Sequence, residues 1–278
     1  MHRSKRLSKI IGITILGVGG LCMLLPFVFL ISSSFKSAAK IYVFPPQIIP
    51  NPFRWQNYVE VFTAVPVLNY AKNTLLITIF STIGTVFSSI LAGYAFARLR
   101  FKGRDLVFSL LLTTLMLPYV VTMIPIYVMF SKLKWINTLL PLIVPSYFGD
   151  AFFIFLLRQF FRTIPMELED AARIDGAGRL RILFQIMVPL ARPAVVVVTI
   201  MAVLENWNAF MQPLIFLTKR SVWTLALGLN SLQRFETGRD WTHYMMVVGV
   251  FMVVPVVILY FLAQREFIQG IVMTGLKG

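Results

Sequence analysis

The stretch PMELEDAARIDGAGRLRILFQIMVPLARP, residues 165–193, decides how the chain is organised, because it is a polar, helix-forming insert between long apolar runs. Thr163 is expected to cap a helix that begins near Pro165, since proline suits the first helical position. Acidic residues fill its first turn, where negative charge complements the helix dipole. Gly176 is predicted to end this helix in the left-handed conformation. A second helix is predicted over 179–188, ending at the following proline.

The first helix has two predicted faces. Leu168, Ala171 and Ala172 share one face by their i, i+3 and i+4 spacing, and Glu169 is placed to pair with Arg173 on another. The second helix is predicted to present Leu180, Leu183, Phe184 and Met187 to one side. Because the first helix is acidic and rich in small residues, unlike the basic helices that bind lipid headgroups, the insert is interpreted as a surface for a protein partner.

The composition around this insert is that of a membrane protein. Hydrophobic residues make up 58% of the 278 residues and charged residues only 13%, where about 25% is usual in soluble domains. Each membrane-spanning helix needs about 20 apolar residues. We therefore predict an all-α membrane protein with six transmembrane helices, over 10–31, 74–97, 106–130, 136–157, 194–217 and 245–263.

The positive charge of the chain is explained by membrane topology. The first apolar run is longer than the roughly 7 to 15 residues of a signal peptide, so it is predicted to be a retained span that follows a basic N-terminus. With both termini in the cytoplasm, most of the 26 Lys and Arg residues fall on the cytoplasmic side, including those of 98–104 and of the insert. The net charge of +15 therefore does not require a nucleic-acid partner.

Three further patterns predict local structure. Small residues recur through 74–97, which predicts an interior helix that neighbours approach closely. Pro118 and Pro125 predict breaks within the third span, next to protein or a cavity. The proline-rich segment 32–73 is expected either to cap the outer face of the bundle or to be a linker, with a short amphipathic helix around 55–62.

The insert also carries a resemblance. Residues 167–177, Glu-Leu-Glu-Asp-Ala-Ala-Arg-Ile-Asp-Gly-Ala, with the later Val188-Pro189-Leu190 and Pro193, resemble the EAA loop of the integral permease subunits of bacterial ABC importers, within the carbohydrate-uptake group typified by the second maltose permease. Residues 206–214 resemble the fifth-span signature of that family, and 264–278 resemble its C-terminal tail. One departure is visible, because Asp170 stands where the motif has its first Glu.

The resemblance implies a type-1 ABC importer permease fold and a set of partners. Its implied domains are 1–69, a permease core over 70–263 that includes the EAA loop at 165–193, and a cytoplasmic tail over 264–278. The loop implies contact with an ATPase subunit through Glu169, Asp170, Ala171, Ala172, Asp175, Gly176, Ala177 and Pro189. The further implied partners are a second permease subunit that forms a heterodimer with this chain, two ATPase subunits that bind ATP and Mg, and an extracytoplasmic substrate-binding protein. The implied location is the bacterial cell membrane.

Polar residues inside the fifth predicted span are the candidates for a substrate pathway. Intramembrane carboxylates usually face an interior cavity, and Asp150 and Glu205 are the two inside predicted spans. Planar polar side chains beside an indole suit a hydroxyl-rich sugar, which nominates Glu205, Asn206, Trp207, Asn208 and Gln212. The alternative is that these groups only hydrogen-bond neighbouring helices, and for Asp150 that it pairs structurally with an Arg.

Other classes of function are weighed against this interpretation. An ion-coupled secondary transporter would show inverted repeats or paired broken helices, and would leave the insert unexplained. A membrane enzyme would need a nucleophile, a metal set or a second clustered carboxylate beside Asp150 or Glu205. The sequence has no Gly-rich Lys-Ser/Thr phosphate loop, no metal-ligand spacing around its two His residues, and Cys22 as its single cysteine. We therefore expect no catalytic residue, no metal and no cofactor in the chain itself.

Overall fold

The computed structural model describes residues 2–233 and 240–275, and within them it is helical, with no strand. The helices are α1 (His2–Ser34), α2 (Ala38–Ile41), α3 (Asn57–Ala64), α4 (Val67–Arg98), α5 (Arg104–Thr113), α6 (Tyr119–Lys132), α7 (Leu140–Ile143), α8 (Ala151–Thr163), α9 (Met166–Ile174), α10 (Arg179–Ile182), α11 (Val188–Leu190), α12 (Arg192–Trp207), α13 (Met211–Phe216), α14 (Leu225–Leu232) and α15 (Thr242–Gly275). Short turns of other helical types are η1 (Thr114–Met116), η2 (Val144–Phe148), η3 (Leu183–Met187) and η4 (Arg220–Val222).

The predicted number of spans is confirmed, although two spans differ in shape. Four helical stretches, within α1, α4, α7 to α8 and α15, are long and apolar enough to cross a membrane, and the count reaches six when each of two bent helix pairs is one span. The end of the predicted tail, 276–278, lies outside the described residues. The chain divides into two compact units, one of Met1–Val67 with Gly228–Val254 and one of Leu68–Leu227 with Pro255–Gly278.

The third span bends at a proline. The helices over Arg104–Met116 and Tyr119–Lys132 meet at 101°. Leu117 is extended, with ψ 114°, because the ring of Pro118 disfavours the helical conformation of the residue before it. Pro125 stays inside α6. One of the two predicted prolines therefore makes the break.

The fifth span is not the single helix predicted over 194–217. Instead α12 ends at Trp207 and follows a helical stretch over Arg179–Leu190 at an angle of 83°. The amide of Asn206 donates to the carbonyl of Ala202 at 2.7 Å, and that of Asn208 donates to the carbonyl of Leu204 at 2.9 Å. Such side-chain bonds compete with the helix for its own backbone groups. The prediction missed that the helix ends among these polar residues.

In the unit that holds the N-terminus, buried contacts hold both ends of the proline-rich segment, whereas most of residues 42–56 are exposed. Asn57, at the start of α3, is fully buried and donates to the carbonyls of Ser34 and Lys36, both at 2.8 Å. Burial lowers the pKa of the Lys36 ammonium, which donates to the carbonyl of Gln47. The ring of Tyr58 meets that of Phe251 edge-on at 5.9 Å. These contacts join the segment to α1 and to the first part of α15.

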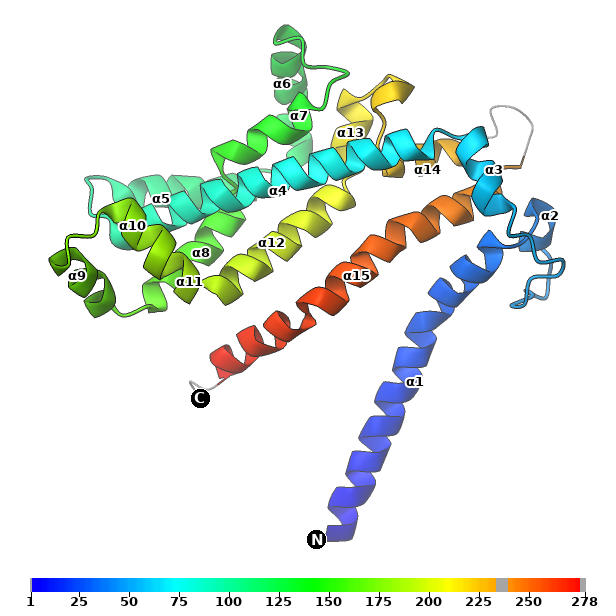
Figure 1. Cartoon of the computed structure of the whole chain (residues 1–278), viewed down its shortest axis with the longest axis horizontal. Coiled ribbons are helices and arrows are strands. Elements are labelled where there is room, and N and C mark those ends of the chain that lie inside the picture. The colour runs from blue at the N-terminus through cyan, green and yellow to red at the C-terminus, as the bar shows by residue number, and fades with distance from the viewer. Residues whose placement is uncertain (1, 234–239, 276–278) are drawn as a thin grey trace. The chain divides into compact units, whose positions relative to one another are not determined.

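In the other unit, α4 is the helix against which the others pack, as its small residues predict. Ser81 and Ser88 donate to the carbonyls of Leu142 and Ser146, at 2.9 and 3.1 Å. A Cβ atom added at Gly84 would lie 2.6 Å from the ring of Tyr147. The helices α9 and α10 lie beside the C-terminal end of α4, and α6 and α13 lie farther toward its N-terminal end (Figure 1). Small side chains thus set the close packing of this unit.

Two apolar clusters hold these helices at different points along α4. One contains Tyr94 of α4 with Leu157 of α8 and Val198 of α12. The other contains Ile77 of α4 with Phe130 of α6 and Phe216 of α13. Both clusters lie within the same unit, so α4 connects them directly.

The contact between α4 and α8 gives a first prediction, at Gly93. A Cβ atom there would lie 3.1 Å from Cβ of Leu157 and 3.2 Å from the backbone nitrogen of Arg158. We expect Gly93→Leu to destabilise the subunit by about 1–3 kcal/mol through overpacking, measured as a lower Tm in detergent. Gly17→Leu is the control, because a Cβ at Gly17 would have no neighbour within 4 Å. Equal Tm values for the two variants would contradict the close approach.

Candidate functional site

The insert begins with a buried carboxylate. Glu169, on α9, is fully buried although it lies in a charged helix. Its Oε1 accepts from the hydroxyl of Tyr94 at 3.0 Å and from Nη2 of Arg173 at 2.7 Å. Its Oε2 lies 3.8 Å from Nε of Arg98. The predicted pair with Arg173 is therefore confirmed, but Glu169 faces the interior of this chain, away from any surface partner.

Arg98 is the buried cation that faces Glu169, and we call the two residues the anchor of α9. The sequence analysis did not predict this role, because it placed Arg98 in a basic loop. It is the last residue of α4, and its side chain is only 3% exposed. Its Nη2 donates to the carbonyl of Phe161 at 2.7 Å and to that of Ile164, both at the end of α8. Carbonyls at the end of a helix lack the usual i+4 donor, and that of Phe161 otherwise accepts only a long bond of 3.4 Å from the N–H of Ile164. Arg98 therefore fastens the end of α4 to the end of α8 and, through Glu169, to α9.

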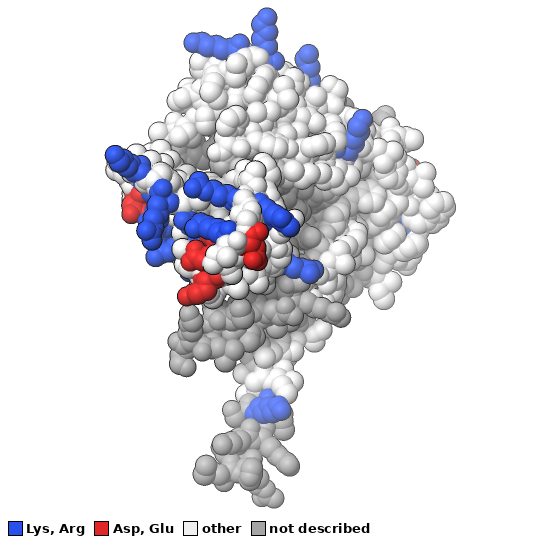
Figure 2. Space-filling view, turned by 60° about the vertical axis from the view of Figure 1, so that its left-hand side comes forward, with Lys and Arg blue, Asp and Glu red and all other residues white. Residues whose placement is uncertain are grey.

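The opposite side of α9 is free. Asp170, Ala171 and Asp175 are exposed, and Ile174 is 86% exposed. Asp170 lies 3.6 Å from Arg173 of its own helix. Figure 2 is turned toward the end that bears α9 and α10, and it shows charged side chains of both signs gathered in one patch there. The helix α9 is therefore held on its buried side by ionic contacts. Its exposed side presents the apolar side chain of Ile174 beside acidic residues.

The predicted glycine turn is confirmed. Gly176 has φ +78°, in the left-handed region that favours glycine. Its N–H donates to the carbonyl of Arg173 at 3.0 Å, and the N–H of Ala177 donates to that of Ala172 at 2.9 Å. This pair of bonds is the Schellman ending of an α-helix. The predicted cap by Thr163 is wrong, because its hydroxyl donates back to Phe160 in the preceding helix.

The second helix of the insert is irregular. It comprises α10, the π-helical turn η3 and α11, and it runs one residue past Pro189, which is exposed. Leu183 and Met187 are buried whereas Leu180 and Phe184 are exposed, so the four residues do not share the one side that was predicted. A π-turn has a wider repeat than an α-helix, so apolar residues at α-helical spacing separate onto different faces.

The insert residues predicted to contact the ATPase fall into two groups, one buried within this chain and one exposed. Glu169 and Ala172 are buried within this chain and Ala177 is partly buried. The exposed members are Asp170, Ala171, Asp175, Gly176 and Pro189. Ile174, the most exposed apolar residue of α9, was not nominated. The sequence pattern that could have identified Ile174 is an apolar residue directly before the Asp and Gly that end the helix.

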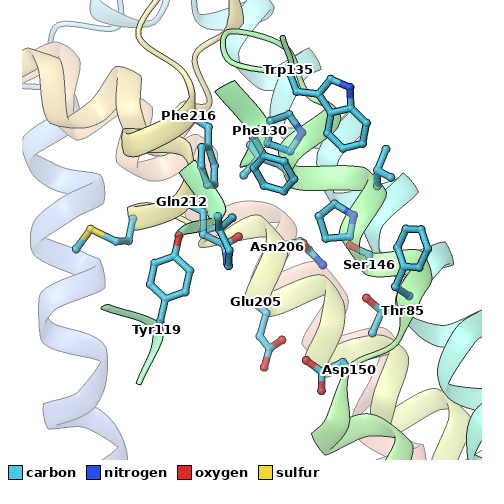
Figure 3. Close-up of a pocket in the computed structure, with 18 of the residues that line it drawn as sticks. Thr85, Tyr119, Phe130, Trp135, Ser146, Asp150, Glu205, Asn206, Gln212 and Phe216 are labelled. Carbon is cyan, nitrogen blue, oxygen red and sulfur yellow. The ribbon is translucent and has the colours of Figure 1, made fainter. Parts of the chain in front are cut away.

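A cavity of about 720 Å³ lies within the same unit, between α4, α6, α12 and α13. Asp150, Glu205, Asn206 and Gln212 line it (Figure 3). Phe153, in the first turn of α8, is also among the lining residues. Their assembly depends on breaks in the helices, since Gly149 has φ +98° and Asp150 then caps α8. The predicted polar cluster is therefore partly brought together around one space.

Two of the five nominated pathway residues do not line this cavity. Trp207 is buried and Asn208 is exposed, and neither is among the lining residues. Asp150 has a structural role, but as a helix cap: its Oδ1 accepts from the backbone N–H groups of Phe152 and Phe153 at 2.9 and 3.1 Å. It forms no ion pair with an Arg among the described residues. The lining residues missed from sequence include Thr85, Tyr119, Trp135 and Ser146.

Comparison with known proteins gives consistent similarities. The family model described as "Binding-protein-dependent transport system inner membrane component" matches residues 84–272. The chain is 33% identical over 258 residues to the inner membrane ABC transporter permease protein YcjP of Escherichia coli, covering 92% of this chain and 91% of that protein. It is also 33% identical over 256 residues to the arabinooligosaccharides transport system permease protein AraQ of Halalkalibacterium halodurans, covering 91% of each.

The fold has a solved counterpart. A chain in the crystal structure of a bacterial ABC transporter involved in the import of the acidic polysaccharide alginate superposes with a TM-score of 0.84 at 24% sequence identity. The match covers 95% of this chain and 98% of that chain.

Proposed function

The chain belongs to the family of binding-protein-dependent transport system inner membrane components, and from this premise we propose that it translocates a carbohydrate into the cell. As a member of that family it is a multi-pass inner-membrane permease subunit of the ABC type, and a transport component, not an enzyme. This membership displaces the ion-coupled secondary transporter as the alternative.

The carbohydrate substrate is supported by the relatives and by the cavity. AraQ is described as a permease for arabinooligosaccharides. The cavity combines amide and hydroxyl groups with aromatic rings, such as those of Gln212, Tyr119 and Trp135. Side chains of this kind bind the hydroxyl groups and the apolar faces of sugar rings. Glu205 and Asn206 are the fifth-span residues that we propose contact the substrate.

The observation that carries a role in energy coupling is the anchored α9. Its inner side is fixed by Glu169 and Arg98, while Ile174 projects into solvent. An apolar knob on a rigid helix suits insertion into a groove of a protein partner. We propose that this partner is the ATPase subunit, which binds ATP and Mg, and that Asp170, Asp175 and the turn at Gly176 surround the contact.

The remaining partners are inferred from the family. Its description as binding-protein-dependent supports an extracytoplasmic protein that delivers the substrate. We further propose that a second permease subunit completes the pathway and that two ATPase subunits bind the pair, one through α9 of this chain. Co-purification of the tagged full chain in mild detergent, expressed with its neighbours in the membrane, is the direct measurement.

A substitution at the tip of α9 tests the proposal. We expect Ile174→Glu to reduce the amount of co-purifying ATPase subunit at least about ten-fold, because loss of a central anchor residue of an interface costs about 2 kcal/mol or more and the new carboxylate would be buried in an apolar groove. The conservative Ile174→Val should retain the ATPase. The measurement is the ATPase to permease ratio after affinity purification.

The control places the same change on an exposed apolar residue elsewhere. Val59 on α3 is 57% exposed and lies in the other compact unit. Val59→Glu is expected to leave the ratio unchanged. Wild-type amounts of ATPase bound to the Ile174→Glu subunit would refute α9 as the contact.

A further inference from the structure

The charged side chains that line the cavity are all acidic in the described part of the chain. Among the described residues that line it, Asp150 and Glu205 are carboxylates, and there is no Lys, Arg or His. The two carboxylates point toward the same part of the cavity (Figure 3). Lys132 and Lys134 neighbour lining residues in sequence, but both are exposed and neither lines the space. The wall that this chain contributes is therefore acidic.

Glu205 has no structural explanation in its surroundings. It stands in the last turn of α12, where the helix dipole disfavours negative charge. It forms no ion pair among the described residues. An intramembrane carboxylate without a stabilising partner lowers stability. Its position at the cavity therefore indicates that Glu205 interacts with the molecules that enter the cavity.

The rest of the lining offers neutral hydrogen-bonding groups. The hydroxyl of Tyr119 is buried without a hydrogen-bond partner in the described part of the chain, and it points toward Gln212 (Figure 3). Asn206 adds a second amide. A buried polar atom left unpaired is costly, and a saccharide hydroxyl would satisfy it.

We propose that this cavity selects by charge, admitting neutral and amino saccharides and repelling saccharides that carry carboxylate, sulfonate or phosphate groups. Two like charges in a cleft with low-dielectric walls change the local concentration of small ions by about 10- to 1,000-fold. That the selected molecule is a saccharide rests on the proposed function. The charge preference rests only on the cavity and is tested separately.

The test measures the electrostatic potential directly. Cys22 is the single cysteine of the chain, so Cys22→Ser with Ser146→Cys, or with Thr85→Cys, places one thiol at the cavity. The full chain, purified with its partners into lipid nanodiscs, is treated with a cationic trimethylammonium-ethyl or an anionic sulfonatoethyl methanethiosulfonate. The mass of this chain reports each modification rate, and the ratio is normalised to that of a free thiol.

We expect the cationic reagent to be favoured at least about ten-fold over the free-thiol ratio. Adding Glu205→Gln and Asp150→Asn should remove the preference, and asparagine keeps the helix cap because its side-chain oxygen also accepts backbone N–H bonds. Asp105→Asn is the matched control, since it removes one carboxylate that pairs with Arg104 outside the cavity. It should leave the ratio as it was.

Three results would overturn the proposal. A ratio equal to that of the free thiol would show that the cavity is not acidic. A preference that survives both substitutions would assign it to other groups. Failure of neutral methyl methanethiosulfonate to label either thiol would show that the cavity is closed to small solutes.

The class of substrate has its own test, which does not depend on α9. Uptake by cells that carry the complete transporter is compared for three radiolabelled disaccharides of matched size: cationic diglucosamine, neutral cellobiose and anionic digalacturonate. Uptake of either of the first two at least ten-fold above the third is expected. Preferred uptake of digalacturonate would overturn the proposed charge selection. It would not affect the permease role, which is tested separately by co-purification of the ATPase.

Discussion

Arg98→Met is expected to lower the stability of the subunit by about 3 kcal/mol and to abolish transport. Removing one partner of a buried ion pair typically costs about 3–5 kcal/mol, because the other charge stays buried. The lower end of that range applies here, since Arg173 and Tyr94 still contact Glu169. The carbonyls of Phe161 and Ile164 would each lose the bond from Arg98 as well. Unfolding in detergent and uptake by cells are the two measurements.

A second substitution separates burial from charge. Arg173 contacts the same carboxylate, at 2.7 Å, but its side chain is 45% exposed. Because Arg173 is in contact with solvent, water can reach the carboxylate when Arg173 is removed, so less charge is left buried without a partner. Arg173→Met should therefore cost much less than Arg98→Met. Equal losses would mean that Arg98 is not an anchor, and wild-type stability of Arg98→Met would contradict the buried contact itself.

Gly176→Val is expected to reduce uptake more than ten-fold while the subunit still inserts in the membrane. Valine is β-branched, and holding it at φ +78° costs on the order of 1–3 kcal/mol. Space is not the obstacle, because a Cβ atom at Gly176 would meet no atom within 4 Å. The strain would instead undo the Schellman bonds and turn Asp175 and Ala177 away from their positions.

Gly178 provides the matched control two residues later. Its φ of −72° and ψ of 160° are ordinary extended values, and a Cβ there would also meet nothing within 4 Å. Gly178→Val is therefore expected to retain uptake. Immunoblotting of membrane fractions confirms insertion of both variants. Wild-type uptake by the Gly176→Val subunit would remove the turn from the proposed coupling surface.

Features that depend on near neighbours in the sequence were predictable. The apolar runs, the left-handed Gly176 and the pair of Glu169 with Arg173 all follow from spacing within one helix. Each of these features depends on contacts a few residues apart in the sequence, or on the contrast between solvent and lipid. The interior position of α4 was also predictable from its small residues, although the contacts that they make are with distant parts of the chain.

Features that depend on distant parts of the chain were not predictable. Arg98 looked like one of several loop cations, and only the fold brings the ends of α8 and α9 to it. The polar residues near the end of α12 were interpreted as one cluster, yet the amides of Asn206 and Asn208 both bond back to their own helix. Ending the helix there separates Trp207 and Asn208 from the cavity that receives Glu205 and Asn206. A single sequence does not show which competing partner an amide takes.

The continuity of α4 has a mechanical consequence. Its 32 residues make a rod about 48 Å long, with no proline or break within it. One apolar cluster packs against it near Ile77 and the other near Tyr94. Arg98 joins its C-terminal end to α9 through Glu169. A stiff rod held at several points bends little, so these contacts fix the distance between α9 and the helices of Phe130 and Phe216, which line the cavity. The anchored helix and the cavity are therefore parts of one rigid framework.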